Sequence, residues 1–277
     1  MWEAAEGLPE LTSTETAGLM QVIQWYFGAS PINSYFGTEV RPILPLGIGE
    51  ILCGDPDPSS VLLAFGGMAV AGVSNGSDSY ALWVTHQVLT AMDQTLKDAR
   101  IVVVGGSPTF IAAARNRYPE VTFLAGLARR EYLALVAASG RQILTPGLAS
   151  MYEADALQLA PLFLPGLHKS MLLQSADLLD RGYEGTSEWG WQRSLLPALR
   201  HEPEEQLLLE LARQIRASLV DPAAASALVE RISDYLLEDT GPALNLNVPK
   251  ALPTSQKTVE LVLGVSSPAA PLSSGLP

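Results

Sequence analysis

The sequence predicts an α/β fold in which a Rossmann-like, doubly wound parallel sheet carries helices on both faces. Short, continuous apolar segments alternate with helix-length amphipathic segments between about residues 58 and 200. Several of the apolar segments end in glycine, which tight strand-to-helix turns favour. Strands that alternate with helices at this spacing are joined by βαβ crossovers, and such crossovers make a sheet parallel. A chain of 277 residues is long enough to bury a full core around such a sheet.

The first buried strand is expected at 61–65, where five apolar residues precede Gly66. A helix capped by Asp78 or Ser79 follows and runs to about Leu96. The alternation then continues with strand 100–106, helix 110–117, strand 121–124, helix 130–138, strand 142–144, helix 150–158, strand 162–164 and helix 170–180. Two amphipathic helices with acidic outer faces are expected at 202–219 and 222–237.

The domain organisation follows from shifts in composition. Residues 1–57 are interpreted as an N-terminal extension or linker, the remnant of another domain's edge, in which 19–27 is a short apolar helix or strand. Residues 58–200 form the Rossmann-like domain and residues 201–240 the C-terminal helices. Residues 241–277 are expected to be an extended, largely disordered tail with a stray strand at 258–265, because a Pro/Ser-rich segment buries little apolar surface.

Charge and cysteine content exclude several function classes. A net charge of −12 argues against nucleic acid and against anionic lipid surfaces. A small anionic ligand stays compatible, since amides at a helix start can hold it locally. Cys53 is the only cysteine and the three histidines are far apart, so neither an internal disulfide nor a metal site is expected. Without a secretion signal or a membrane-spanning stretch, the sequence predicts a soluble, cytoplasmic protein.

The carboxyl ends of the strands are the expected ligand-binding edge, as in other open parallel sheets. Four expected strand ends are small or glycine-rich, namely 66–68, 105–107, 126–127 and 145–147. A ligand can therefore approach the backbone closely at each of them, although tight turns favour glycine for their own reasons. That all four strand ends are small or glycine-rich indicates a binding edge more strongly than any single loop does.

Two interpretations of Ser150 and Glu153 remain open from the residues alone. As a capping box, the Ser150 hydroxyl accepts a helix-start amide and the Glu153 carboxylate reaches back to the cap amide. As a ligand site, the amides from Gly147 to Ser150 hold a diphosphate and Glu153 accepts the two hydroxyls of a ribose. Because a carboxylate has several lone pairs, the two interpretations are compatible.

The sequence resembles the donor-binding, C-terminal half of GT-B glycosyltransferases over about residues 58–200. The resemblance rests on TPGLAS with Glu153-Ala154, on APLFLP at 160–165, on His168-Lys169 and on QSADLL at 174–179. These runs are similar to the nucleotide-sugar site of the lipid-II-forming N-acetylglucosaminyltransferase and of natural-product glycosyltransferases. Cytosylglucuronate synthases of nucleoside-antibiotic pathways are the nearest match.

The resemblance implies a UDP-type nucleotide sugar as substrate, with no further cofactor and no metal. It also implies a role for each matching position. The diphosphate would be held by the turn and helix start at Pro146, Gly147, Leu148, Ala149 and Ser150, and the ribose by Glu153. The sugar would contact His168, Lys169 and Gln174, and the base would contact a backbone group of Leu127. The phosphates or the acceptor would face Gly66, Gly67 and Met68. Gln174 is shifted by about one helical turn from the family's pattern, which leaves the sugar's identity open.

The acceptor half of such an enzyme has no counterpart here, since fewer than about 60 residues precede the first expected strand. The sequence is therefore interpreted as a truncated donor half whose catalytic base is unknown, because His86 falls in a helix. Its expected partner is a separate acceptor-domain protein or a second copy of the chain. The alternative is a nucleotide-sugar-binding or auxiliary protein without turnover. A nucleotide-sugar epimerase ranks below both, because no acid/base cluster is visible.

Overall fold

The computed structural model describes residues 56–66, 76–238 and 241–248 in full, and the backbone of three short strands at 21–24, 34–35 and 38–43. The chain divides into two compact units, of which the larger includes residues 50–246 and the smaller includes the three short strands. The strand expected at 258–265 and the disorder expected beyond residue 248 fall outside the described residues.

The smaller unit contains one sheet of three strands, β1 (Gln21–Gln24), β2 (Ser34–Tyr35) and β3 (Thr38–Ile43). β3 lies in the middle, parallel to β1 and antiparallel to β2. The apolar segment at 19–27 was open between helix and strand in the sequence. Its described part is a strand.

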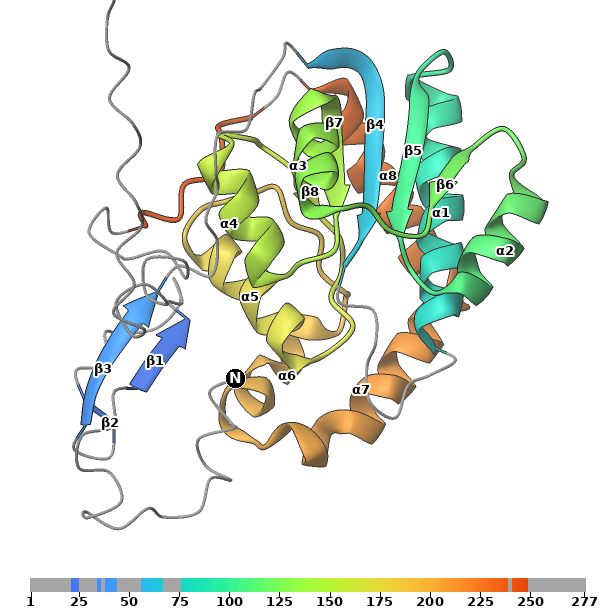
Figure 1. The fold of residues 1–277 in the computed structure, drawn as a ribbon. Coiled ribbons are helices and arrows are strands. Elements are labelled where there is room, and N and C mark those ends of the chain that lie inside the picture. The colour runs from blue at the N-terminus through green and yellow to red at the C-terminus, as the bar shows by residue number, and fades with distance from the viewer. Residues whose placement is uncertain are drawn as a thin grey trace, which may run out of the picture. The chain divides into compact units, whose positions relative to one another are not determined.

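The larger unit is built on five parallel strands in the order β6-β5-β4-β7-β8 (Figure 1). The strands are β4 (Asp57–Phe65), β5 (Arg100–Gly105), β6 (Thr122–Leu124), β7 (Ser139–Leu144) and β8 (Leu162–Phe163). The chain starts at the centre of the sheet, moves outward to β6, and then resumes on the other side of β4. This is the doubly wound strand order, so the predicted fold class is confirmed.

The helices of the larger unit agree with the predicted ones to within three residues at each end, with one exception. They are α1 (Gly76–Thr95), α2 (Pro108–Arg117), α3 (Arg129–Ala138), α4 (Leu148–Ala156), α5 (Lys169–Asp180), α6 (Gln192–His201), α7 (Glu204–Leu219) and α8 (Pro222–Leu237). The exception is α6, which the sequence did not predict. Pro197 lies inside it and lacks an amide donor, a feature that in a sequence indicates a helix break.

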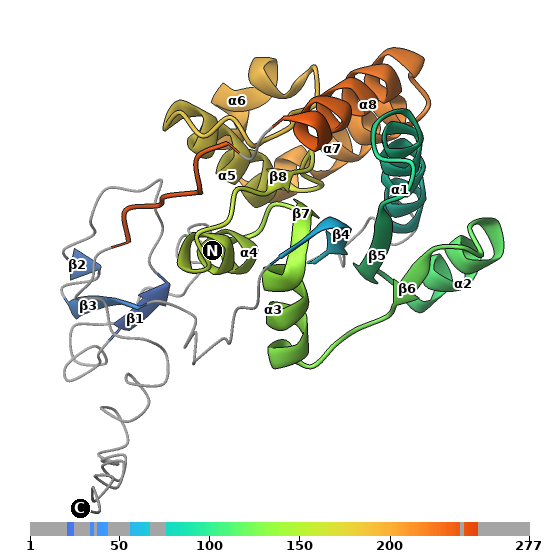
Figure 2. The same ribbon diagram turned by 90° about the horizontal axis from the view of Figure 1, so that it is seen from above.

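Burial along β4 explains why helices cover both faces of the sheet. Val61, Leu63 and Phe65 belong to the core cluster that also includes residues of α1, α2 and α8. Leu62 and Ala64 point to the opposite face and are also at most 5% exposed. In Figure 2, α1 and α8 lie on one side of the sheet, and α3 and α4 lie on the other.

The C-terminal helices pack onto the sheet domain. On α8, the Tyr235 hydroxyl is 3.1 Å from both the amide and the carbonyl oxygen of Gln142, in β7. Beyond α8, Leu244 and Leu246 are each 1% exposed. The Leu246 amide donates to the Asp155 carboxylate of α4 at 2.8 Å. The described start of the expected tail is therefore extended and packed against α4.

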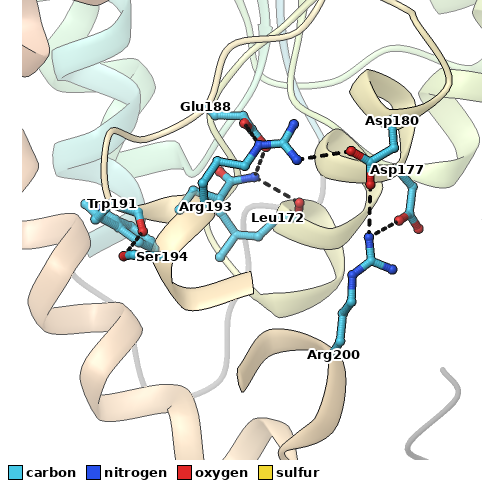
Figure 3. A network of polar contacts seen from close by, with 9 residues as sticks. Leu172, Asp177, Asp180, Glu188, Trp191, Arg193, Ser194 and Arg200 are labelled. Atoms are coloured by element: carbon cyan, nitrogen blue, oxygen red, sulfur yellow. Dashed lines mark hydrogen bonds and ion pairs between the residues drawn. The ribbon is translucent and has the colours of Figure 1, made fainter. Parts of the chain in front are cut away.

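Charged side chains connect α5 to α6 (Figure 3). Arg193 contacts Glu188 at 2.6 Å and Asp180 at 3.1 Å, and Arg200 contacts Asp177 at 2.9 Å and Asp180 at 3.2 Å. Asp180 is shared by the two arginines, so the contacts form a network rather than isolated pairs. The network fixes α6 beside α5 although α6 contains a proline.

Thr145 joins the ends of β4 and β7, the two strands at the centre of the sheet. Its amide donates to the Ala64 carbonyl oxygen at 3.0 Å. Its hydroxyl accepts from the Gly66 amide at 2.8 Å and donates to the Gly66 carbonyl oxygen at 3.0 Å. Thr145 is 2% exposed, so its hydroxyl is shielded from solvent although Gly66 itself is exposed. One hydroxyl thus satisfies both backbone groups of Gly66.

Replacing this hydroxyl should weaken the fold. Thr145→Val keeps the shape of the side chain but removes two hydrogen bonds, so we expect a loss of about 1–2 kcal/mol in the free energy of unfolding. Thr145→Ser, which keeps the hydroxyl, should lose less. Thr122→Val, at an exposed strand position, is the control, with an expected change within about 0.5 kcal/mol. Urea denaturation measures all three, and equal effects at 145 and 122 would contradict the role of Thr145.

Candidate functional site

The candidate site lies where β4 and β7 end. The helices that follow these two adjacent strands lie on opposite faces of the sheet, α1 on one and α4 on the other (Figure 2). In doubly wound folds this point, where the strand order reverses, is where ligands bind. Gly66 ends β4 there, and the turn from Thr145 to Gly147 leads from β7 into α4. Gly67 and Met68, also predicted for the site, lie outside the described residues.

The glycines at the strand ends separate into two kinds. Gly105 and Gly106 both have φ +87°, and a Cβ on Gly105 would lie 2.1 Å from the Phe65 carbonyl oxygen. These two glycines are required by the fold itself. Gly147 has an extended backbone with φ −167°, and a Cβ there would meet nothing within 4 Å. The open space at Gly147 therefore leaves room for a group outside the described chain.

The first amides of α4 have no acceptor within the helix. Gly147 is the N-cap and makes no side-chain cap, because it has no side chain. The first hydrogen bond of the helix runs from the Met151 amide to the Gly147 carbonyl oxygen at 3.0 Å. The amides of Leu148, Ala149 and Ser150 therefore have no acceptor within the helix. Together with the helix dipole they favour a negative charge at this point.

The expected capping box at Ser150 and Glu153 is wrong. The helix begins at Leu148, two residues earlier than predicted, so Ser150 is its third residue and Glu153 its sixth. The turn 145–147 is shorter than predicted because α4 begins directly after Gly147, whereas β7 ends at Leu144 as expected. Of the two interpretations, the capping function is thus removed. Ser150 and Glu153, three residues apart, still share one face of α4.

Glu153 is a buried carboxylate with one cationic neighbour. Its side chain is 6% exposed, and Oε1 lies 3.2 Å from Nη2 of Arg129, the first residue of α3. Burial raises the pKa of Glu153, and Arg129 offsets part of that rise. Tyr132, also on α3, lies nearby: burial raises its pKa, Glu153 raises it further, and a hydrogen bond with Ser150 lowers it. Sequence reasoning missed Arg129 and Tyr132, because α3 and α4 are brought together only by the fold.

The loop after β6 leads directly to Arg129. Leu127, predicted to present a backbone group to a base, is half-buried, and Ala125 and Gly126 before it are exposed. The Ala128 amide donates to the Glu131 carboxylate at 3.1 Å, which fixes the start of α3. The loop thus ends at the residue that contacts Glu153. The contact of Leu127 with a ligand stays a prediction.

The predicted sugar-contacting residues lie after β8, on α5 and its cap. His168 is the N-cap of α5, its Nδ1 lies 2.9 Å from the Ser170 hydroxyl, and burial lowers its pKa. Lys169 is 6% exposed and its ammonium donates to the Glu202 carbonyl oxygen at 2.5 Å, next to the end of α6. Gln174 is 8% exposed, and its buried Oε1 has no hydrogen-bond partner among the described residues. The roles of these three residues toward a sugar stay predictions.

A separate cavity of about 820 Å³ opens at the opposite, amino end of the sheet. It is lined by the starts of β4 and β5, including Asp57 and Arg100, and by His86 of α1. None of the residues predicted for the site lines it. Within the described ranges, no cluster of three or more His, Cys, Asp or Glu side chains could hold a metal. Nor does any described helix have the length and hydropathy needed to cross a bilayer.

No family model and no curated protein matches the sequence. The solved structures to which this chain is similar include several glycosyltransferases. Spinosyn rhamnosyltransferase SpnG complexed with thymidine diphosphate is 13% identical, with 81% of this chain and 52% of that chain covered and a TM-score of 0.40. UGT89C1 of Arabidopsis thaliana complexed with UDP-L-rhamnose is 14% identical, with 80% and 57% covered and a TM-score of 0.40.

A Thermobaculum terrenum O-GlcNAc transferase mutant is 17% identical, with 78% of this chain and 45% of that chain covered and a TM-score of 0.38. The chain therefore spans about half the length of the solved structures it matches. Likeness at these values carries no functional argument, which must come from the residues of this chain.

The open N-cap of α4 can be tested by filling it. Gly147→Ser supplies a hydroxyl that can accept an α4 amide, so we expect it to stabilise the protein by roughly a few tenths of a kcal/mol. The same side chain would occupy the space over the amides and weaken the binding of UDP by about tenfold. Thermal melting and calorimetry measure the two effects. Unchanged or tighter binding of UDP by a folded Gly147→Ser protein would show that the open N-cap has no part in binding.

The buried charge of Glu153 should cost stability at neutral pH. Because its pKa is raised in the folded protein, the native state loses stability as pH rises from the ordinary glutamate pKa through the raised value. Glu153→Gln removes that loss, so its melting temperature should exceed the parent's above this interval and converge with it below. Melting curves between about pH 4 and pH 8 measure the difference. A parent that is more stable at neutral pH would identify the contact with Arg129 as a net-stabilising ion pair.

Proposed function

We propose that this chain binds a UDP-type nucleotide sugar at the carboxyl edge of its sheet and serves as the donor-binding half of a glycosyltransferase. The diphosphate would lie at the start of α4, and Glu153 would accept the hydroxyls of the ribose. The base would lie toward Leu127 and the start of α3, and the sugar toward His168 and α5. Transfer of a sugar to an acceptor hydroxyl is the proposed reaction.

One observation carries this proposal: α4 combines helix-start amides that have no acceptor within the helix with a buried acidic side chain on the face of Ser150. The amides of Leu148, Ala149 and Ser150 suit an anion such as a diphosphate. Glu153, one turn further, is acceptor-only when ionised, which suits a pair of hydroxyl donors. A nucleoside diphosphate presents both features in this order. A carboxylate that is kept buried at a cost also fits a binding role better than a structural one.

The proposal accommodates the acidic character of the chain without a metal ion. The net charge of −12 would repel a diphosphate at long range. At the site, however, the amides of α4 and the guanidinium of Arg129 supply positive potential over a few ångströms. We therefore expect UDP to bind in the presence of a chelator. The substrate itself is the only small molecule that the proposal requires.

The proposed reaction also requires an acceptor site, and we assign none of the described residues to it. The chain spans about half the length of the glycosyltransferase structures it matches. We propose that a separate acceptor-domain protein, or a second copy of this chain, completes the enzyme and supplies the general base. Such a base contributes typically about 10²- to 10⁴-fold to the rate, so transfer by this chain alone should be slow.

A binding protein without turnover is the second candidate, and a specific observation favours it. Two side chains predicted to reach the sugar are engaged elsewhere, His168 with Ser170 and Lys169 with Glu202. In that case the chain would bind UDP-sugars without releasing UDP, with or without an acceptor-domain partner. Release of UDP from a UDP-sugar, followed over time, separates the two candidates.

The ribose contact can be tested with 2′-deoxy-UDP, which lacks one hydroxyl of the diol. If Glu153 accepts that hydroxyl, the parent should bind UDP about tenfold or more tightly than 2′-deoxy-UDP, since hydrogen bonds to charged groups are strong. In Glu153→Ala the affinity for UDP should fall and the preference should shrink toward one. Isothermal titration calorimetry measures both ligands on both proteins.

Glu120→Ala, at an exposed position between α2 and β6, is the matched control and should keep the parent's preference. A folded parent that fails to bind millimolar UDP would refute the proposed function. A preference for UDP that survives in Glu153→Ala would refute the ribose contact alone.

A further inference from the structure

The contact between Arg129 and Glu153 joins two elements that are distant in the sequence. Arg129 begins α3 after β6, and Glu153 lies in α4 after β7. The guanidinium reaches Oε1 at 3.2 Å. The arginine side chain is 47% exposed, whereas the carboxylate is 6% exposed. One charge of the pair is thus buried and the other is partly in water.

This asymmetry shows which partner depends on the other. An arginine that is half-exposed remains well solvated without the contact. A carboxylate buried without a cationic partner is strongly disfavoured in its charged form. Among the described residues, the titratable groups that act on Glu153 are Arg129 and Tyr132, both from α3. Tyr132 is uncharged at neutral pH, because its pKa is raised. Arg129 is therefore the group that compensates the charge of Glu153.

The contact leaves room for a second partner of the carboxylate. The closest approach of Arg129 to the carboxylate is from Nη2 to Oε1. A carboxylate offers about four lone-pair positions on its two oxygens. A guanidinium at one position therefore fixes the orientation of the carboxylate while other positions accept hydroxyl groups. Ser150 lies on the same side of α4, one turn nearer the helix start, where the first three amides have no acceptor within the helix.

We propose that Arg129 is a positioning residue for nucleotide binding, which holds Glu153 ionised and oriented so that the carboxylate can accept the ribose hydroxyls. The inference rests on the proposed function and names a residue that serves the same site without touching the ligand. A protonated Glu153 carries a hydroxyl donor of its own and cannot accept both diol protons equally well. Loss of Arg129 would therefore make recognition of the ribose dependent on pH.

The test compares the preference for UDP over 2′-deoxy-UDP across pH in the parent, Arg129→Gln, Arg129→Lys and Arg130→Gln. At high pH, Arg129→Gln should show the same preference for UDP as the parent, about tenfold. As the pH is lowered, this preference should fall below about twofold in both proteins, but in Arg129→Gln the fall should occur at a higher pH than in the parent. Arg129→Lys, which keeps the charge, should restore most of the parent's profile. Arg130→Gln, at the exposed neighbouring position, should behave as the parent does.

Two outcomes would overturn the proposal. A uniform loss of affinity for both nucleotides, with the preference unchanged at every pH, would mean that Arg129 contacts the diphosphate directly. A change in melting temperature with no change in either affinity or preference would mean that the pair only ties α3 to α4. Circular dichroism confirms that each variant is folded before it is titrated.

A measurement without ligand separates this inference from the proposed function. In protein labelled with ¹³C at glutamate carboxyl groups, the Glu153 signal, assigned with Glu153→Gln, reports its titration directly. The pKa of Glu153 should be higher in Arg129→Gln than in the parent and unchanged in Arg130→Gln. If UDP does not bind but the Glu153 titration shifts, the proposed function fails while the control of Glu153 by Arg129 stands. An unshifted titration overturns the inference whatever the protein binds.

Discussion

The structure of the candidate site depends on how the two central strands are held together. β4 and β7 are neighbours in the sheet but are separated by about 80 residues in the sequence, and α1 and α4 leave them toward opposite faces. The divergence of these helices creates the edge at which a ligand can approach. At this edge the hydroxyl of Thr145 holds the end of β4 to the end of β7, because it is hydrogen-bonded to both the amide and the carbonyl oxygen of Gly66. Because the backbone groups of Gly66 are satisfied by Thr145, the described donors that we assign to a ligand are the first amides of α4.

The balance between stability and binding is visible in the contrast between Gly105 and Gly147. Gly105 is fixed by the fold, since any side chain there would collide with the backbone of β4. Gly147 is under no such constraint, and a serine or aspartate at the same N-cap would stabilise α4. Glu153 repeats the pattern, because a neutral side chain would avoid the cost of burying a charge. Two positions of one helix thus depart from what stability alone favours, and both lie where a diphosphate and a ribose would be bound.

Sequence patterns were sufficient for the sheet and insufficient for the contacts within the site. The strands could be predicted because a strand buried on both faces is continuously apolar, as 61–65 and 101–104 are. The start of α4 was misplaced because Ser150-x-x-Glu153 satisfies the capping rule, while the residue that caps the helix is a glycine without a capping side chain. α6 was missed because Pro197 indicates a break, and the arginine network that holds the helix involves residues from other elements. Arg129 could not be assigned to Glu153 because 24 positions and a strand separate them, and only the packing of α3 beside α4 brings them together.

In an acidic protein, the net charge repels a diphosphate at long range, so binding would depend on positive groups close to the site. At physiological ionic strength, exposed charges are screened over about 8 Å, so most of the net charge of −12 acts weakly on a ligand already in the site. The groups that would act on it at short range are the three amides of α4 without an acceptor in the helix, the dipole of α4 and the guanidinium of Arg129, which contacts Glu153. Glu153 opposes them with one negative charge, and its contact with Arg129 confines that charge to a position beyond the amides. In the proposed binding mode the arginine would serve the anion as well as the carboxylate, since without it a buried negative charge near the start of α4 would be uncompensated.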